Sequence, residues 1–106
     1  MAVDVCIVNV VGRLDSVTTP AFEKDLTGRI GEGATRVVCN LAGCDYVSST
    51  ALRVILNTAR SLKRQGGGFA LCCARQYVME VLEVAGFTAI IPVHEAEADA
   101  VASLQA

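Results

Sequence analysis

Residues 48–73 read SSTALRVILNTARSLKRQGGGFALCC, and they join a helical pattern to a strand pattern through three glycines. Apolar side chains recur at intervals of three and four from Leu52 to Leu62, whereas arginine and asparagine side chains fill the opposite side. This spacing predicts an amphipathic helix over residues 49–64 that stops at the glycines. The segment GFALCC that follows is typical of a buried strand.

The same alternation of strand and helix patterns extends in both directions. The predicted strands cover residues 3–11, 36–41, 68–73 and 89–93, the last an edge strand because of Pro92. The first predicted helix has Thr19 as its N-cap and Pro20 as its first helical residue. The other three predicted helices begin at residue 49, near residue 78 and near residue 95. Strands that alternate with helices imply crossover connections and a mainly parallel sheet. We therefore predict an α/β fold with a four- to five-stranded sheet and about four helices, as a single domain over residues 1–106.

Composition narrows the class of protein. Hydrophobic residues make up 53% of the chain, with two Tyr, three Phe and no Trp, so the core must be built from aliphatic side chains. The net charge is −2 and the nine basic residues are scattered, which argues against nucleic acid as a partner. The apolar stretches are too short to span a membrane, and the N-terminus lacks the pattern of a signal peptide. We therefore expect a cytoplasmic protein with no nucleic-acid or membrane partner.

The cysteines and the single histidine indicate no metal site. Five cysteines without a C-x-x-C spacing predict neither a disulfide framework nor zinc, and no motif places a ligand beside His94, so we expect no cofactor. Cys44 is predicted to lie in a loop before the 49–64 helix, where a helix N-terminus can lower the pKa of a thiol. A small thiol enzyme that uses Cys44 is one alternative, and a half-buried loop residue without chemistry is the other.

The loops after parallel strands emerge together at the carboxyl edge of a sheet, which is where sites are built. This topology places Asp15, in the turn after the first strand, next to Ser48, Ser49 and Thr50, and we expect the Asp15 side chain to face solvent. Either Ser48 or Ser49 fits as the N-cap of the 49–64 helix, but one cap needs only one of the three hydroxyls.

The surplus hydroxyls favour a phosphate rather than a nucleophile. The chain has no G-x-S-x-G elbow and its histidine has no evident acidic partner, so we predict that it is not an enzyme. A phosphoserine at a helix N-terminus would face free N–H groups and the positive end of the helix dipole. Arg53, four residues after Ser49, is placed to pair with such a phosphate. Helix capping alone remains the simpler explanation.

Four motifs, in their order and spacing, resemble the STAS domain of bacterial anti-sigma factor antagonists. They are GRLD (12–15), DYVSSTALRVIL (45–56), GGGFALC (66–72) and VLEVAGF (81–87). The resemblance implies a single STAS-type domain and a partner-switching role, in which the antagonist binds an anti-sigma factor that is often itself a serine protein kinase. Phosphorylation of one serine of the antagonist breaks the complex, and a PP2C-type phosphatase restores it.

Carried over residue by residue, the resemblance places the phosphorylated serine at Ser49 and an acidic residue of the partner surface at Asp15. We expect Ser48, Thr50 and Arg53 beside them to complete the partner-binding surface.

Two departures from the family pattern keep a second interpretation open. Many members have Asp where this chain has Ser48, and Gly where it has Ala51. The alternative is therefore a STAS scaffold or ligand-sensing module that is not phosphorylated. Members also usually begin with an additional strand, whereas this chain starts almost directly at the strand before GRLD, so an open sheet edge would favour a weak homodimer.

Overall fold

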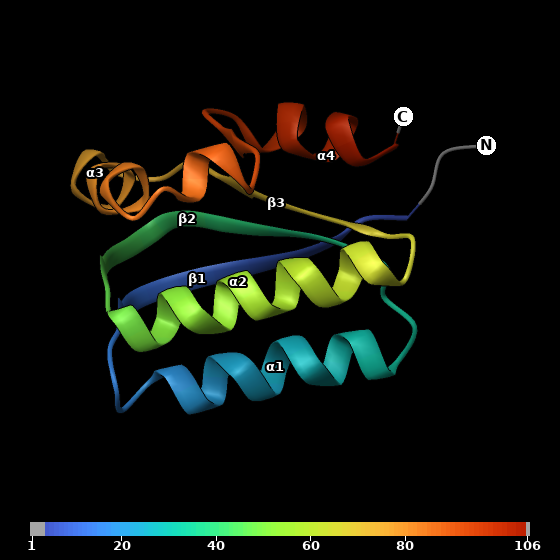
Figure 1. The fold of residues 1–106 in the computed structure, drawn as a ribbon, viewed down its shortest axis with the longest axis horizontal. Helices are drawn as coiled ribbons and strands as arrows, with labels where there is room; N and C mark the ends of the chain where they lie inside the picture. Colours follow the sequence, from blue (N-terminus) through green and yellow to red (C-terminus); the bar gives the residue numbers. More distant parts are fainter. Residues whose placement is uncertain (1–3, 106) are drawn as a thin grey trace.

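Strands and helices alternate along the chain, as the sequence predicts (Figure 1). The computed structural model describes residues 4–105. Its strands are β1 (Cys6–Leu14), β2 (Arg36–Val47), β3 (Gly68–Cys72) and β4 (Val93–His94). Its helices are α1 (Thr19–Gly31), α2 (Ser49–Arg64), α3 (Gln76–Val84) and α4 (Glu97–Gln105), with a short 3-10 helix, η1 (Phe87–Ala89), after α3. Within this described range, none of the helices is long and apolar enough to cross a membrane.

The four strands form one parallel sheet in the order β1-β2-β3-β4, which confirms the predicted α/β fold. Each step from one strand to the next passes through a helix, so the carboxyl ends of all four strands meet at one edge. β1 lies at one margin of the sheet, and no further strand pairs with it among residues 4–105.

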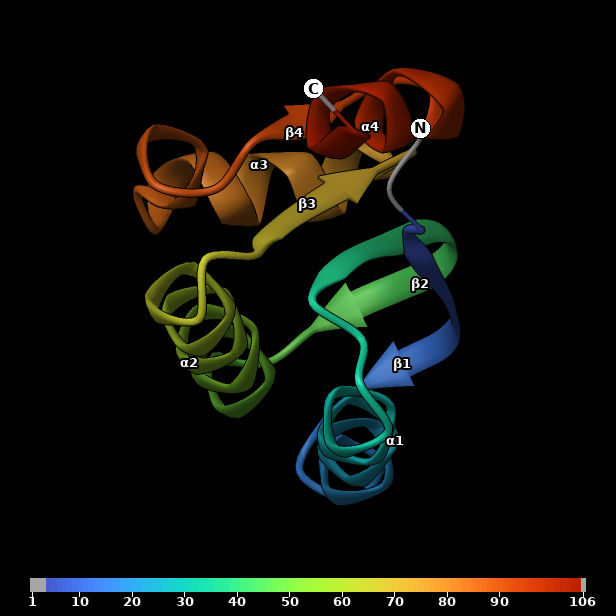
Figure 2. The same cartoon turned by 90° about the vertical axis from the view of Figure 1, so that its right-hand side faces the viewer.

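Helices α1, α2 and α3 cover one face of the sheet, whereas α4 covers the other (Figure 2). The larger core lies under the first three helices and is mainly aliphatic, as the composition predicts. Its fully buried side chains include Leu26 of α1, Ile55 of α2 and Leu82 of α3. The smaller core joins the middle of the sheet to Ala100 of α4.

Helix α2 has the predicted bounds, but its buried face is turned relative to the expected one. Its fully or nearly fully buried residues are Ala51, Val54, Ile55 and Leu62. Leu52 and Leu56, which belong to the apolar stripe of the predicted helix, pack against the core but are only half-buried. The reason is that α2 packs against α1 as well as against the sheet. One side of its apolar stripe, including Leu52 and Leu56, is left close to the surface.

β1 and β2 extend further toward the carboxyl edge than the sequence predicts. β2 continues from residue 41 to Val47 because residues 43–47 keep pairing with β1 across two shifts of register. β1 correspondingly runs to Leu14 instead of ending at residue 11, and Gly12 adopts φ 84° at the second shift. The predicted start of this strand at residue 3 lies outside the described residues. Cys44, which we expected in a loop, is therefore part of a strand.

The predicted strand over residues 89–93 is wrong except at its end. Gly86, at φ 79°, follows α3, and the N–H groups of Ile90 and Ile91 then donate to the carbonyl oxygen of Phe87 (2.9 and 2.8 Å). These bonds form a tight turn, which leaves only Val93 of the predicted segment paired with β3.

The start of α1 is displaced by one residue from the prediction. Thr18 is the N-cap, Thr19 is the first helical residue and Pro20 is the second. The buried Thr19 hydroxyl donates to the carbonyl oxygen of Asp15, and the Thr18 side chain makes no capping bond. The turn is organised by Asp15 instead.

Candidate functional site

The ends of β1 and β2 form the first half of the candidate site. Leu14 pairs with Val47, and the N–H of Ser48 donates to the Leu14 carbonyl oxygen (2.8 Å). This bond holds the turn that begins at Asp15 next to the start of α2. The structure thus brings Asp15 and the hydroxyl run to the same edge of the sheet.

Ser48 and Ser49 have different surroundings. Ser48 is the N-cap of α2: its Oγ accepts a hydrogen bond from the N–H of Ala51 (3.2 Å), and its carbonyl accepts one from Leu52 (3.0 Å). Ser49 and Thr50 are exposed in the first turn, and neither hydroxyl makes a hydrogen bond within residues 4–105. The cap is therefore Ser48, and the Ser49 hydroxyl is accessible and unused.

Asp15 is a structural residue as well as a surface one. Its Oδ1 accepts hydrogen bonds from the N–H groups of Val17 (2.9 Å) and Thr18 (3.0 Å), and Oδ2 lies 3.8 Å from Nε of Arg13. The hydrogen bond from Thr18 N–H, followed by that from Val17, holds the pKa of the Asp15 carboxyl below its usual value. The side chain is one-third exposed, with a relative accessibility of 33%, rather than freely facing solvent as we expected.

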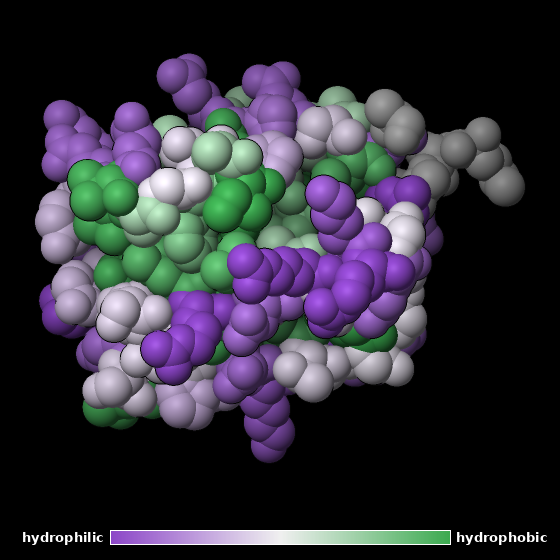
Figure 3. Space-filling view, viewed as in Figure 1, coloured by the Kyte–Doolittle hydropathy of each residue, from purple (hydrophilic) through white to green (hydrophobic). Residues whose placement is uncertain are grey.

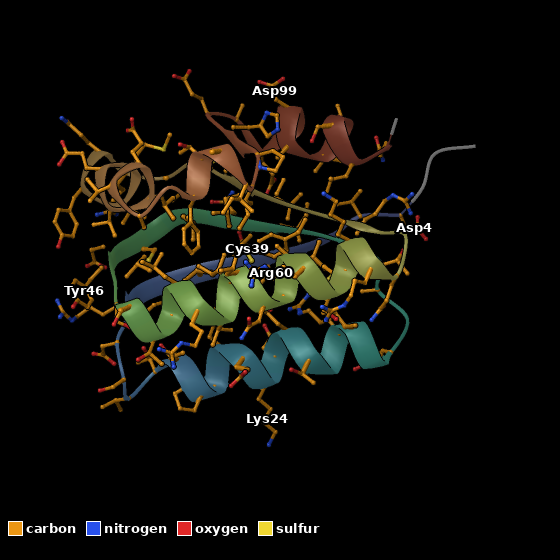
Figure 4. All side chains as sticks on the ribbon, viewed as in Figure 1. Asp4, Lys24, Cys39, Tyr46, Arg60 and Asp99 are labelled. Atoms are coloured by element: carbon orange, nitrogen blue, oxygen red, sulfur yellow. The ribbon has the colours of Figure 1, made fainter. Side chains whose placement is uncertain are left out.

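Arg13 and Tyr46 are not among the site residues that the sequence predicts. These residues pair across β1 and β2, and the Arg13 guanidinium lies over the Tyr46 ring, 4.3 Å from its centroid. Figure 4 shows Tyr46 at the end of the sheet where α2 begins. Arg13 lies two residues before Asp15, and Tyr46 lies two residues before Ser48. Their contact depends on the register between β1 and β2, which the spacing along the chain does not reveal.

Arg53 is exposed on α2, as the helical pattern predicts. It makes no hydrogen bond or ion pair within residues 4–105, so its guanidinium is available to a phosphate or a partner. The other basic residues of α2 are Arg60, Lys63 and Arg64, and the helix contains no acidic residue.

Cys44 does not have the surroundings of a reactive thiol. Its residue is fully buried in β2, and its Sγ lies 3.4 Å from the carbonyl oxygen of Tyr46. Burial raises the pKa of this thiol above its usual value, which is the opposite of what a thiolate nucleophile requires. The structure therefore removes the basis for a thiol enzyme that uses Cys44.

The ends of β3 and β4 form the second half of the carboxyl edge and enclose a hollow of about 440 Å³. Its lining includes Met79 and Glu80 of α3, His94 at the end of β4, and Glu95. Nε2 of His94 is buried and has no hydrogen-bond partner within the described part of the chain. Residues 4–105 contain no cluster of side chains that could hold a metal ion.

Comparisons with known proteins agree on one family. A family model described as the STAS domain matches residues 2–100. BtrV of Bordetella bronchiseptica, named as a candidate anti-sigma factor antagonist, is 35% identical over 94 residues, which cover 89% of this chain and 81% of BtrV. The anti-sigma-B factor antagonist of Bacillus subtilis is 28% identical over 86 residues, which cover 81% of this chain and 78% of that protein. These are names of regulatory proteins rather than enzymes.

Solved structures share the fold. A crystal structure from Thermotoga maritima, of a candidate anti-sigma factor antagonist, has a TM-score of 0.91 at 23% identity and covers 100% of this chain and 92% of that one. The unphosphorylated form of the anti-sigma factor antagonist SpoIIAA has a TM-score of 0.73 at 16% identity, covering 93% of this chain and 86% of SpoIIAA. SpoIIAA of Bacillus in its phosphorylated form has a TM-score of 0.71 at 17% identity, covering 93% and 89%.

Proposed function

Because this chain belongs to the STAS domain family, we propose that it is a cytoplasmic anti-sigma factor antagonist controlled by phosphorylation of Ser49. In its unphosphorylated form it binds an anti-sigma factor with serine kinase activity and so frees the sigma factor or another client. Phosphorylation releases the partner, and a PP2C-type phosphatase restores binding. The names of the relatives and the phosphorylated form of SpoIIAA support this proposal.

The observation that carries the proposal is that Ser48 and Ser49 differ in their hydrogen bonding. The Ser48 side chain caps α2, which leaves the Ser49 hydroxyl exposed and without an intramolecular role. A kinase can therefore modify Ser49 without removing a bond that stabilises the helix. The absence of an acidic residue from the first turn of α2 also favours a phosphate there.

The consequence of the phosphate should fall on the partner rather than on the fold. Free N–H groups and the helix dipole oppose the added charge within this chain. A partner packed against the same turn would have to desolvate or repel a dianion, which weakens the complex. Asp15 and Thr50 lie beside Ser49 and would contact the partner, and Arg53 would pair with the phosphate.

The experiment has two steps. Wild-type protein is used to capture a kinase from cells of its source, and the purified kinase is then incubated with wild-type protein, Ser49→Ala and Thr50→Ala. We expect intact-mass analysis to show one phosphate on wild type and on Thr50→Ala, and none on Ser49→Ala. A phosphate on Ser49→Ala at the wild-type rate would refute the assignment of Ser49.

The hollow beside His94 favours a second candidate function, a ligand-sensing STAS module. His94 lines this hollow, and its buried Nε2 has no partner within residues 4–105, so a small ligand could satisfy that atom once the side chain turned toward the hollow. The open margin of β1 likewise keeps weak self-association as a prediction. Sedimentation of wild-type protein over a range of concentrations tests it.

A further inference from the structure

Two adjacent cysteines, Cys72 and Cys73, stand where β3 ends. Both are free thiols; Cys72 is fully buried, whereas Cys73 is half-buried. Cys72 belongs to the smaller core under α4, and Cys73 packs against that same core. Consecutive side chains of a strand normally point to opposite faces of a sheet, so the shared side of these two thiols is unusual.

The backbone conformation of Cys73 accounts for the shared side. Its φ is 61°, and within residues 4–105 it is the only residue other than glycine with a positive φ. A left-handed backbone is costly for a residue with a Cβ and persists where the surroundings hold it. Here the N–H of Cys73 donates to the carbonyl oxygen of His94 (3.0 Å), and Nε of Arg75 donates to that of Ala42 (2.9 Å). The segment after β3 is therefore tied to both neighbouring strands.

The two sulfur atoms interact with each other. Burial, followed by a hydrogen bond with the Cys73 thiol, raises the pKa of Cys72 to about 12. A Cys72 thiol that keeps its proton can donate it toward the Cys73 sulfur and so support negative charge there. The two thiols therefore differ in role: the buried one holds a proton, and the half-buried one is the nucleophile that a small oxidant can reach.

The sheet separates this pair from the other cysteines. Cys39 and Cys44 belong to the larger core on the opposite face, and Cys6 packs against that core. Among the described residues, Cys73 is therefore the only thiol on the same side of the sheet as Cys72. Because no third ligand within residues 4–105 completes a metal site with them, the pair is better suited to a sulfur–sulfur bond.

We propose that Cys72 and Cys73 form a modification site, a vicinal dithiol that a peroxide oxidises to a disulfide within this chain. With hydrogen peroxide, the Cys73 thiolate attacks one oxygen and the O–O bond breaks, which leaves a sulfenic acid on Cys73 and a hydroxide that becomes water. The Cys72 sulfur then attacks the Cys73 sulfur, and the sulfenic oxygen leaves as water with the proton of Cys72. Two electrons pass from the sulfurs to the peroxide, which ends as two molecules of water.

Such a disulfide would be a reversible modification rather than a structural cross-link. The Cα atoms of adjacent residues lie about 3.8 Å apart across a trans peptide, closer than the roughly 4.4–6.8 Å usual for a disulfide. The bond is therefore strained and easily reduced, which suits a cytoplasmic protein whose thiols are normally kept reduced. This inference goes beyond the phosphate switch, because it concerns the end of β3 rather than the start of α2.

Peptide mapping of the oxidised protein tests the inference directly. Trypsin cleaves after Arg64 and Arg75, and the peptide between these sites, residues 65–75, contains Cys72 and Cys73 but no other cysteine. Folded wild-type protein is reduced, freed of reductant, treated with an equimolar amount of hydrogen peroxide, alkylated and digested. We expect this peptide to lose the mass of two hydrogen atoms and to escape alkylation, and we expect reduced glutathione to reverse both changes.

Three variants distinguish the roles of the two sulfurs. Cys73→Gly suits the left-handed backbone, so it should fold and leave Cys72 a free thiol after peroxide treatment. Cys72→Ala should stop at the sulfenic acid of Cys73, which dimedone traps. The matched control is Cys6→Ala, which removes another half-buried thiol and should form the disulfide at the wild-type rate.

A disulfide between two copies of this chain would be a different product. Exposed apolar side chains gather over α3 and η1, where Val84 is 90% exposed, and could bring two copies together (Figure 3). An intermolecular bond through Cys73 would double the intact mass in the absence of reductant and join the 65–75 peptide to a second peptide. That product in place of the internal disulfide would overturn the inference.

The synthetic peptide 65–75 measures the contribution of the fold. We expect the folded protein to form the disulfide about tenfold or more faster than the peptide, because the fold holds the two sulfurs together. Equal rates would mean that the fold does not prepare the pair, and the inference would be wrong. It would also be wrong if the 65–75 segment of folded wild-type protein kept both thiols after peroxide treatment.

Discussion

The two halves of the carboxyl edge are built differently. At the ends of β1 and β2, side chains are tied to the backbone: Asp15 accepts from Val17 and Thr18, and Ser48 accepts from Ala51. At the ends of β3 and β4, a hollow of about 440 Å³ remains, and Nε2 of His94 is buried without a partner within residues 4–105. The first half is pre-organised, whereas the second has room and an unsatisfied polar atom.

This difference indicates what each half can do. A modification that changes binding but not folding belongs on the pre-organised half, since the surrounding bonds hold the turn in place while the added charge faces the partner. A small ligand would fit the open half, which has a hollow lined by His94. The phosphate switch and the ligand-sensing alternative therefore concern opposite halves of one edge, and each can be tested separately.

The largest expected effect is that of a charge at Ser49. We expect Ser49→Asp to weaken kinase binding by about 100-fold or more, because a charge must be desolvated or repelled within a packed interface. The melting temperature should stay within about 2 °C of wild type, since the N-terminus of α2 favours the negative charge. Calorimetric titration and thermal unfolding monitored by circular dichroism give the two values.

The control for that prediction is Asp45→Asn, which removes a charge from an exposed residue of β2 near the same edge. This control should leave the affinity for the kinase and the melting temperature close to those of wild type. If Ser49→Asp unfolds the protein instead, the first half of the edge is not pre-organised and the comparison fails.

A smaller effect is expected from Asp15→Ala, and it should appear in stability. The substitution leaves the N–H groups of Val17 and Thr18 without their acceptor, so we expect the melting temperature at pH 7 to fall by several degrees.

The pH dependence of this effect follows from the lowered pKa of Asp15. A carboxyl whose pKa is lower in the folded than in the unfolded protein stabilises the fold above the unfolded pKa, and this contribution disappears as the pH falls through the folded pKa. The difference in melting temperature between wild type and Asp15→Ala should therefore be constant from pH 7 to about 5 and shrink below about pH 4. A difference that does not depend on pH would mean that the charge of Asp15 has no role.

A still smaller effect separates the two serines. We expect Ser48→Ala to lower the free energy of unfolding by about 1 kcal/mol, because it removes the cap of α2. Ser49→Ala should change it by less than about 0.5 kcal/mol, because the exposed hydroxyl has no intramolecular partner within the described residues. Urea titration of the two variants side by side measures the difference. Equal losses would mean that the capping role is shared.

The sequence predicts the elements whose signals are local. The bounds of α2 follow from a helical period between hydroxyl residues and glycines, and the parallel sheet follows from the order of the elements. It also predicts that Asp15 and the hydroxyl run share one edge. These features depend on neighbouring residues in the chain or on general rules of topology, so they can be predicted without knowing the tertiary contacts.

The sequence does not predict features that depend on pairing between strands. The segment around Cys44 has no strong strand pattern of its own and is therefore predicted as a loop. Pairing with β1 nevertheless extends β2 across it and buries the thiol. The choice between Ser48 and Ser49 as cap also depends on β1, since the Leu14 carbonyl oxygen fixes the N–H of Ser48. The Arg13–Tyr46 stacking requires the same register.

The smallest expected effect concerns the open half. Nε2 of His94 has no hydrogen-bond partner within the described chain, so the fold gains nothing from its polarity. We expect His94→Phe, which keeps a ring of similar shape, to change the free energy of unfolding by less than about 0.5 kcal/mol, in either direction. Urea titration of His94→Phe beside wild type measures this change. A loss of more than about 1 kcal/mol would mean that the imidazole stabilises the fold, as a satisfied polar group does. Polar side chains would then be hydrogen-bonded in both halves of the edge, and the reason for assigning a ligand to the ends of β3 and β4 would disappear.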